Sequence, residues 1–498
     1  MELSFARKTL SCYQPLEPQR INQEETLELT VPESLPDPQR IVDEQAELIL
    51  RAKELSTGSV SVSGAVQACV LYVAEEETEP RMITGYLPFN LRMEHEGVDS
   101  QSEAELSWQV KSVDVRMLSS RKLLVRVNLS ALFRVWKRTE FSLSTLEEHE
   151  ESVQLLERSY PMLLPACLTE RPFQLQQDAE LPTSLSAIGE LLCYRVQVQV
   201  QEQKISAMSL AFRGVLRLSM RYRNQEGSLG SFETELPFTQ YVDLPEHFEE
   251  AESQMSLLVT DRDLILLDER HVQLQLAMLA QVRVSSYQTV CALEDIYSTE
   301  CQLLPQRESV SISALLDARE LNRTVQEPLD LPCAQVEGVR AIAGVPEISR
   351  REGGFAFAVS VEVQLLCRDA EGKLHARQAR VKAAFNLEAA EKCRILASAS
   401  VLDAFASPSN GGVEFRCTVL LRIECWCTQT LDLVCGAECQ NLPERKDRPS
   451  VVIRRVTGGE SLWSIAKQAG SSVKVLRQVN GLASQEPPEG TLLLIPML

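Results

Sequence analysis

Residues 64–72 read Gly64-Ala-Val-Gln-Ala-Cys-Val-Leu-Tyr72, and Leu87-Pro88-Phe89 follows them. The same order returns downstream, where Gly214 leads through an apolar run to Tyr222 and then to Leu236-Pro237-Phe238. In both copies the tyrosine stands eight residues after the glycine. A pattern that recurs after about 150 residues predicts a chain built from repeated domains.

A third copy is degenerate: Cys367 stands at the tyrosine position, and Ala384-Phe385 replaces Leu-Pro-Phe. A leucine-proline pair gives a second anchor for the repeat, at Leu35-Pro36, Leu181-Pro182 and Leu331-Pro332. Because these anchors return in the same order, we expect three homologous domains of about 100–140 residues, the size of an ordinary β domain.

The secondary structure of the repeats is indicated by three segments that alternate apolar and polar residues, at 125–135, 272–282 and 413–423. Alternation with period two is typical of strands with one buried face. The expected fold is therefore mainly β, with three repeated β-sandwich or barrel-like domains. The repeated glycines and aromatic residues are interpreted as packing positions. One short helix is expected over residues 38–52, where apolar residues are loosely periodic.

The domain boundaries follow from the repeat. We expect the repeat domains at residues 1–145, 146–290 and 291–441, a linker at 442–450 and a separate module at 451–498. The linker is charged and bracketed by two prolines, a composition typical of connecting segments.

The composition limits the possible partners. The chain has 498 residues, 44% of them hydrophobic, and a formal net charge of −20. Such a charge repels phosphate backbones and anionic lipid, so neither nucleic acid nor insertion into a membrane is expected. The N-terminus shows no apolar core of an export signal. With no export signal expected, the fourteen cysteines are predicted to be reduced thiols in a cytosol.

The C-terminal module carries the most specific motifs. It contains Gly459-Glu-Ser-Leu-Trp-Ser-Ile-Ala466, then Asn480-Gly-Leu482 and Gly490-Thr-Leu-Leu-Leu-Ile-Pro496. Helical periodicity after a short strand predicts the order βααβ. The three motifs resemble the conserved segments of LysM domains, with Arg454 where that family usually has tyrosine, Glu460 for aspartate and Ser461 for threonine.

This resemblance implies a shallow groove that binds glycans containing N-acetylglucosamine, or a protein partner. Its two walls are expected to be Gly459, Glu460, Ser461 and Leu462 on one side and Asn480, Gly481 and Leu482 on the other. Backbone amides at a helix start suit an acetamide carbonyl. The alternative for Glu460 and Ser461 is that they only cap the helix. Trp463 is interpreted as a core residue.

Three divergent β repeats followed by one LysM module resemble SipL-type proteins, whose repeats are called SPOCS domains. The Gly-x7-Tyr and Leu-Pro-Phe elements, with residues 31–36, carry this resemblance. It implies a scaffold of endospore coat assembly in the mother-cell cytoplasm, at the forespore surface, with the LysM docking to the coat's morphogenetic ATPase. The alternative is a cell-wall protein that binds peptidoglycan.

Catalytic and metal chemistry have little support in the sequence. Nucleotide-binding loops and the zinc-protease motif are absent, and the five histidines are scattered. The chain is therefore not expected to be an enzyme or to need a cofactor. The best metal candidates, Cys417, Cys425, Cys427, Cys435 and Cys439, lack paired Cys-x2-Cys spacing, so they are interpreted as small buried apolar residues.

Overall fold

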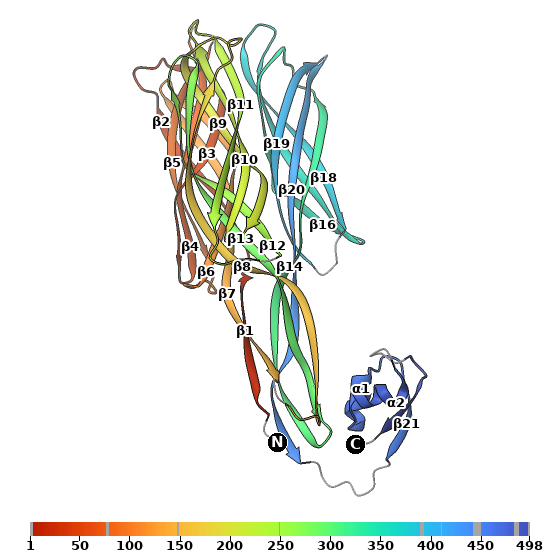
Figure 1. Cartoon of the computed structure of the whole chain (residues 1–498). Helices are drawn as coiled ribbons and strands as arrows, with labels where there is room; N and C mark the ends of the chain where they lie inside the picture. The colour runs from red at the N-terminus through yellow and green to blue at the C-terminus, as the bar shows by residue number, and fades with distance from the viewer. Residues whose placement is uncertain are drawn as a thin grey trace.

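The computed structural model describes residues 3–75, 79–146, 149–248, 250–388, 393–409, 411–441, 450–482 and 488–496. Long antiparallel strands build an elongated body, and two short helices lie in the C-terminal module (Figure 1). The predicted fold, mainly β with three repeated domains and a βααβ end, is confirmed.

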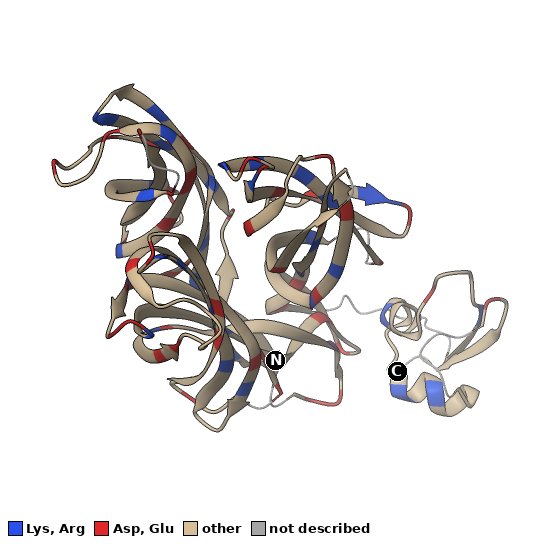
Figure 2. Cartoon of the chain, turned by 90° about the horizontal axis from the view of Figure 1, so that it is seen from above, with Lys and Arg blue, Asp and Glu red and all other residues tan. Residues whose placement is uncertain are grey.

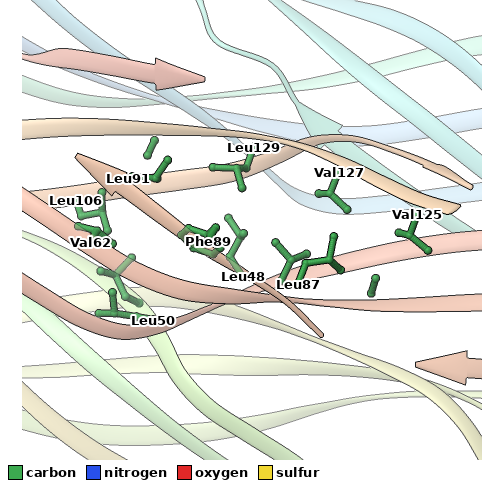
Figure 3. Close-up of a cluster of buried hydrophobic side chains, with 14 of the residues drawn as sticks. Leu48, Leu50, Val62, Leu87, Phe89, Leu91, Leu106, Val125, Val127 and Leu129 are labelled. Atoms are coloured by element: carbon green, nitrogen blue, oxygen red, sulfur yellow. The ribbon is translucent and has the colours of Figure 1, made fainter. Parts of the chain in front are cut away.

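The first repeat contains β1 to β7. Their bounds are β1 (Phe5–Pro15), β2 (Gln19–Thr30), β3 (Pro38–Ser56), β4 (Ser59–Ala74), β5 (Arg81–Glu94), β6 (Ser102–Ser119) and β7 (Lys122–Leu146). The β3–β4–β5 sheet packs against β2 and β6, which flank β7. Alternate residues of β5 and β7, among them Leu87, Phe89 and Val125, fill the core between the two sheets (Figure 3).

The second repeat has the same plan. It consists of β8 (Val153–Glu180), β9 (Ile188–Ser206), β10 (Ser209–Asn224), β11 (Leu229–Asp243), β12 (Ala251–Leu266) and β13 (His271–Ser298). β9, β10 and β11 form a three-stranded sheet, while β8 and β12 flank β13. β13 continues past residue 290, the expected end of this domain.

The third repeat divides one strand in two. It consists of β14 (Cys301–Leu329), β15 (Gln335–Ala343), β16 (Glu347–Arg351), β17 (Gly354–Arg368), β18 (Leu374–Glu388), β19 (Arg394–Ser409) and β20 (Gly412–Asn441). β15 and β16 both pair with β17, in the place that the single strands β3 and β9 have in the other repeats.

The narrow lower part of the body, which we call the stalk, is shared by all three repeats. It consists of β1 and of residues 136–146, 153–165, 286–298, 301–315 and 426–441 (Figure 1). Each repeat contributes one antiparallel ribbon, formed by β1 with β7, β8 with β13, and β14 with β20. Apolar residues from all three ribbons, including Leu143, Leu164 and Leu433, form one core.

A buried ionic cluster lies where the three repeats meet the stalk. Arg283 of β13 has no exposed surface and donates to Glu424 of β20 at 2.7 Å and to Glu105 of β6 at 3.3 Å. Its guanidinium also lies over the rings of Trp136 and Trp426, 4.4 and 5.4 Å from their centroids. One side chain therefore joins groups from the first and third repeats to the second.

The helix expected over residues 38–52 is wrong, because this segment lies in β3. β3 pairs with β4 throughout, but its register shifts between Ile41 and Asp43 and again between Leu50 and Ala52. Each shift interrupts the alternation of period two. The loose periodicity of the apolar residues in this segment therefore results from the register shifts of an irregular strand.

Two sequence anchors are also corrected by the structure. The turn at Leu181-Pro182 is matched in the first repeat by Val31-Pro32, not by Leu35-Pro36, since Val31 and Leu181 make the same backbone bond to Arg121 and Arg270. In the third repeat, Ala383 lies opposite Val359, as Phe89 lies opposite Gly64. Ala383, and not Phe385, therefore corresponds to the repeated phenylalanine.

Candidate functional site

The C-terminal module is framed by one strand pair and two capped helices. Its elements are β21 (Val451–Arg455), α1 (Leu462–Ala469), α2 (Val473–Asn480) and β22 (Leu492–Pro496), and β21 pairs with β22. Ser461 caps α1 by accepting from the amide of Ser464, and Ser472 caps α2 by accepting from the amide of Val475. These caps satisfy amides that a helix start leaves unpaired.

The core of this module includes side chains from both of the expected walls. Leu462, Ile465, Ala466 and Leu476 are buried together with residues of β22. Because Leu462 is only 1% exposed, its side chain belongs to this core and only its backbone can face a ligand. Leu482 packs on the same cluster and is half-buried, so part of its side chain reaches the surface.

The first wall has one exposed glycine and one carboxylate that is already bonded within the module. Gly459 has φ +83° and open space where a Cβ would stand, so its backbone is accessible. Glu460 accepts from the amide of Thr457 at 3.0 Å and forms an ion pair with Arg454. These contacts hold the pKa of Glu460 below its ordinary value, and the bond to Thr457 is the largest cause. Glu460 therefore closes the turn before α1.

Arg454 and Glu460 are two of the departures from the usual LysM pattern, and the structure brings them into contact. Arg454 also donates to Gln468 of α1 at 2.7 Å. The two departures from the usual LysM pattern therefore form one ion pair beside the first wall.

The second wall is held by an asparagine and a glycine. The Asn480 side chain donates to the carbonyls of Leu476 and Leu494 and accepts from the amide of Leu494 at 2.7 Å. It therefore joins the end of α2 to β22. Gly481 ends α2 with φ +60°, and its Cβ position is open. Residues 483–487 of this loop lie outside the described part of the chain.

One surface of the module was missed by sequence reasoning. Trp463 packs on the module's core but also contacts the stalk. Its indole donates to Asp295 of β13 at 2.8 Å, and its ring lies edge-on to that of Tyr297 with the two centroids 4.8 Å apart. These partners lie more than 160 positions away in the sequence, so no local pattern could reveal them.

The cysteines behave mainly as packing residues. Cys417 and Cys425 are buried, and burial raises the pKa of each to about 11, so neither is a thiolate near neutral pH. Among the described residues, no group of three histidine, cysteine, aspartate or glutamate residues could hold a metal ion. The expectation of fourteen free thiols is wrong at one place, because Cys301 and Cys439 form a disulfide between β14 and β20.

The charge pattern distinguishes the repeats from the module. Acidic and basic positions are interspersed along the strands of the body, while basic positions mark the helices of the C-terminal module (Figure 2). In the part of the chain that the structure describes, no helix is long and apolar enough to cross a bilayer.

Comparison with protein families identifies both parts of the chain. Residues 37–118 match the SipL family model of the SPOCS domain, and residues 455–496 match the LysM domain. No curated protein and no solved structure matches the chain. Both domain types are non-catalytic, and together they fit a sporulation-associated protein with a peptidoglycan-binding type of module. The chain thus carries a SPOCS domain of the SipL type near its start and a LysM domain near its end.

Proposed function

We propose that this chain is a non-enzymatic scaffold of endospore coat assembly and that its LysM domain docks to the morphogenetic ATPase of the coat. The observation that carries the proposal is the presence of a SPOCS domain and a LysM domain in one chain. The proposed location is the mother-cell cytoplasm, at the forespore surface. The docking surface is formed by the two walls, residues 459–462 and 480–482.

Two structural features favour a protein partner at this surface. The Glu460 carboxylate is engaged by Arg454 and Thr457, which reduces its availability for sugar hydroxyls. Gly459 and Gly481 both leave backbone exposed, and Leu482, next to Gly481 in the sequence, is half-buried. Protein interfaces combine apolar contact at their core with hydrogen bonds to polar groups, and this surface offers both.

The second candidate is a peptidoglycan-binding role, which the LysM match itself favours. In that case the same walls bind N-acetylglucosamine units through the backbone amides at the start of α1. The two candidates share one surface and differ in its ligand, so both ligands must be measured on the same variants.

Leu482→Asp tests the proposal, because it puts a charge where apolar contact is expected. Val479→Asp is the matched control: it adds the same charge to α2 at a residue that is 48% exposed and outside the walls. We expect Leu482→Asp to weaken binding of the purified ATPase about tenfold or more, equivalent to about 1.4 kcal/mol, while Val479→Asp binds like wild type. Circular dichroism verifies that both variants remain folded.

Binding of N-acetylglucosamine oligomers and of peptidoglycan is measured in parallel. Tight glycan binding by wild type, lost in Leu482→Asp while the ATPase still binds, contradicts protein docking at this surface and supports the second candidate.

A further inference from the structure

The tip of the stalk is in contact with one face of the LysM domain. Asp295 accepts from the Trp463 indole at 2.8 Å and from Lys467 Nζ at 2.8 and 2.7 Å. Trp463 and Lys467 are four positions apart, so they lie on the same face of α1. The Tyr297 hydroxyl donates to the carbonyl of Ser471 at 2.8 Å.

The stalk side of this contact is preorganised. The pairing of β13 with β8 shifts register between Leu293 and Asp295, and such a bulge redirects the side chains beside it. Arg307 of β14 also donates to Asp295 at 2.8 Å. The bonds from the LysM side chains hold the pKa of Asp295 below its ordinary value although burial opposes the shift. Asp295 therefore presents a carboxylate with cationic partners on both sides.

The contact is also apolar. Tyr297 is only 5% exposed and is packed among the LysM core residues Val456, Leu462 and Ile465. Tyr297 thus lies on β13 of the stalk, while its side chain is part of the LysM core. A surface charge pair alone would contribute little, but a buried aromatic side chain adds substantial area.

Chain connectivity favours docking within one molecule. Asn441, the last residue of β20, lies opposite Cys301, which is close in sequence to Tyr297 at the same tip. Only eight residues, 442–449, separate it from Ser450. The nine Cα–Cα steps from Asn441 to Ser450 span at most about 32 Å. The LysM domain is therefore tethered beside its own docking site at a high effective concentration.

We propose that Asp295 and Tyr297 form an intramolecular docking site for the LysM domain of the same chain. The site holds the α1 face that carries Trp463 and Lys467. Gly459 and Gly481 remain exposed in the docked state, so the domain is fixed in orientation while both walls keep accessible backbone. This inference does not depend on the ligand of the walls.

Tryptophan NMR tests the docking in the full chain. Because the chain has four tryptophans, selective ¹⁵N labelling gives four indole signals. In wild type we expect the Trp463 signal to be as broad as the other three, since a docked domain tumbles with the body. Asp295→Lys repels Lys467 and should shift and narrow the Trp463 signal alone. Asp432→Lys, at an exposed stalk position away from the contact, should leave it unchanged.

A charge swap separates docking from misfolding. Asp295→Lys combined with Lys467→Asp restores opposite charges and should broaden the Trp463 signal again. A narrow Trp463 signal in wild type, or no change in Asp295→Lys, overturns the proposal. A wild-type signal that narrows on dilution while sedimentation shows a dimer dissociating also overturns it, since the site is then occupied by a second copy.

Discussion

One position of the repeat carries a different residue in each of the three domains, and these three residues contact one another in the folded chain. Trp136, Arg283 and Glu424 each stand eleven positions after the valine that opens the matched segment, at Val125, Val272 and Val413. The repeat makes this equivalence visible in the sequence. It does not reveal that the arginine stacks on the tryptophan and bonds to the glutamate, because that contact depends on how the three domains are arranged around the stalk.

Arg283→Met is expected to destabilise the protein by about 3–5 kcal/mol, because it leaves the buried carboxylate of Glu424 without its closest cation. The control is Arg171→Met, whose exposed pair with Asp243 should contribute less than about 1 kcal/mol. Urea unfolding measures both. A loss below about 1 kcal/mol for Arg283→Met would show that the cluster does not hold the repeats together.

Glu44 should make stability depend on pH. Burial, reinforced by the neighbouring Asp43, raises its pKa from 4.5 to about 7. An acid whose pKa is raised on folding stabilises the fold at low pH, and this contribution is lost as pH rises from about 4.5 through 7. Glu44→Gln removes this loss, so its melting temperature relative to wild type should be higher at pH 8 than at pH 5. An equal difference at both values contradicts the assignment.

At the scale of elements, the repeated glycine and phenylalanine form one packing unit. Gly64 of β4 lies opposite Phe89 of β5, and Gly214 lies opposite Phe238. A Cβ on Gly64 would lie 2.5 Å from the Phe89 ring and 2.6 Å from the carbonyl oxygen of Ile49. The third repeat places Val359 opposite Ala383, which exchanges the large and small partners.

Gly64→Ala should therefore cost about 1–3 kcal/mol through overpacking against the Phe89 ring and a backbone carbonyl that cannot move away. Gly58→Asn is the control: the turn has φ +83°, which asparagine tolerates, and open space at the Cβ position. Thermal unfolding compares the two. A neutral Gly64→Ala would mean that the repeated glycine is not a packing requirement.

Strand alternation allowed the β class of the three repeats to be predicted, and helical periodicity and the LysM motifs allowed the βααβ order of the module to be predicted, because these are local patterns. The register shifts of β3 were not predictable, and they were mistaken for a helix. Of the seven wall residues, the sequence indicated the loops that carry them. It did not indicate that Leu462 is in the core, that Asn480 joins α2 to β22, or that Glu460 pairs with Arg454, since these contacts depend on the folded module.

At the scale of the whole molecule, the three repeats share one core in the stalk, and the LysM domain contacts the tip of that stalk. Each repeat gives a ribbon to the stalk, whose apolar core no single repeat could build alone. The stalk also carries Asp295 and Tyr297, which contact α1. In the proposed function, the three repeats support the LysM domain, and the LysM domain recognises the partner.

This division of roles is tested most directly by recovering partners from sporulating cells with the full chain and with a chain that lacks residues 443–498. The full chain should recover the coat morphogenetic ATPase, and the shortened chain should lose it while its β body remains folded by circular dichroism. Equal recovery of the ATPase by both chains, or recovery of peptidoglycan without the ATPase, would contradict the account.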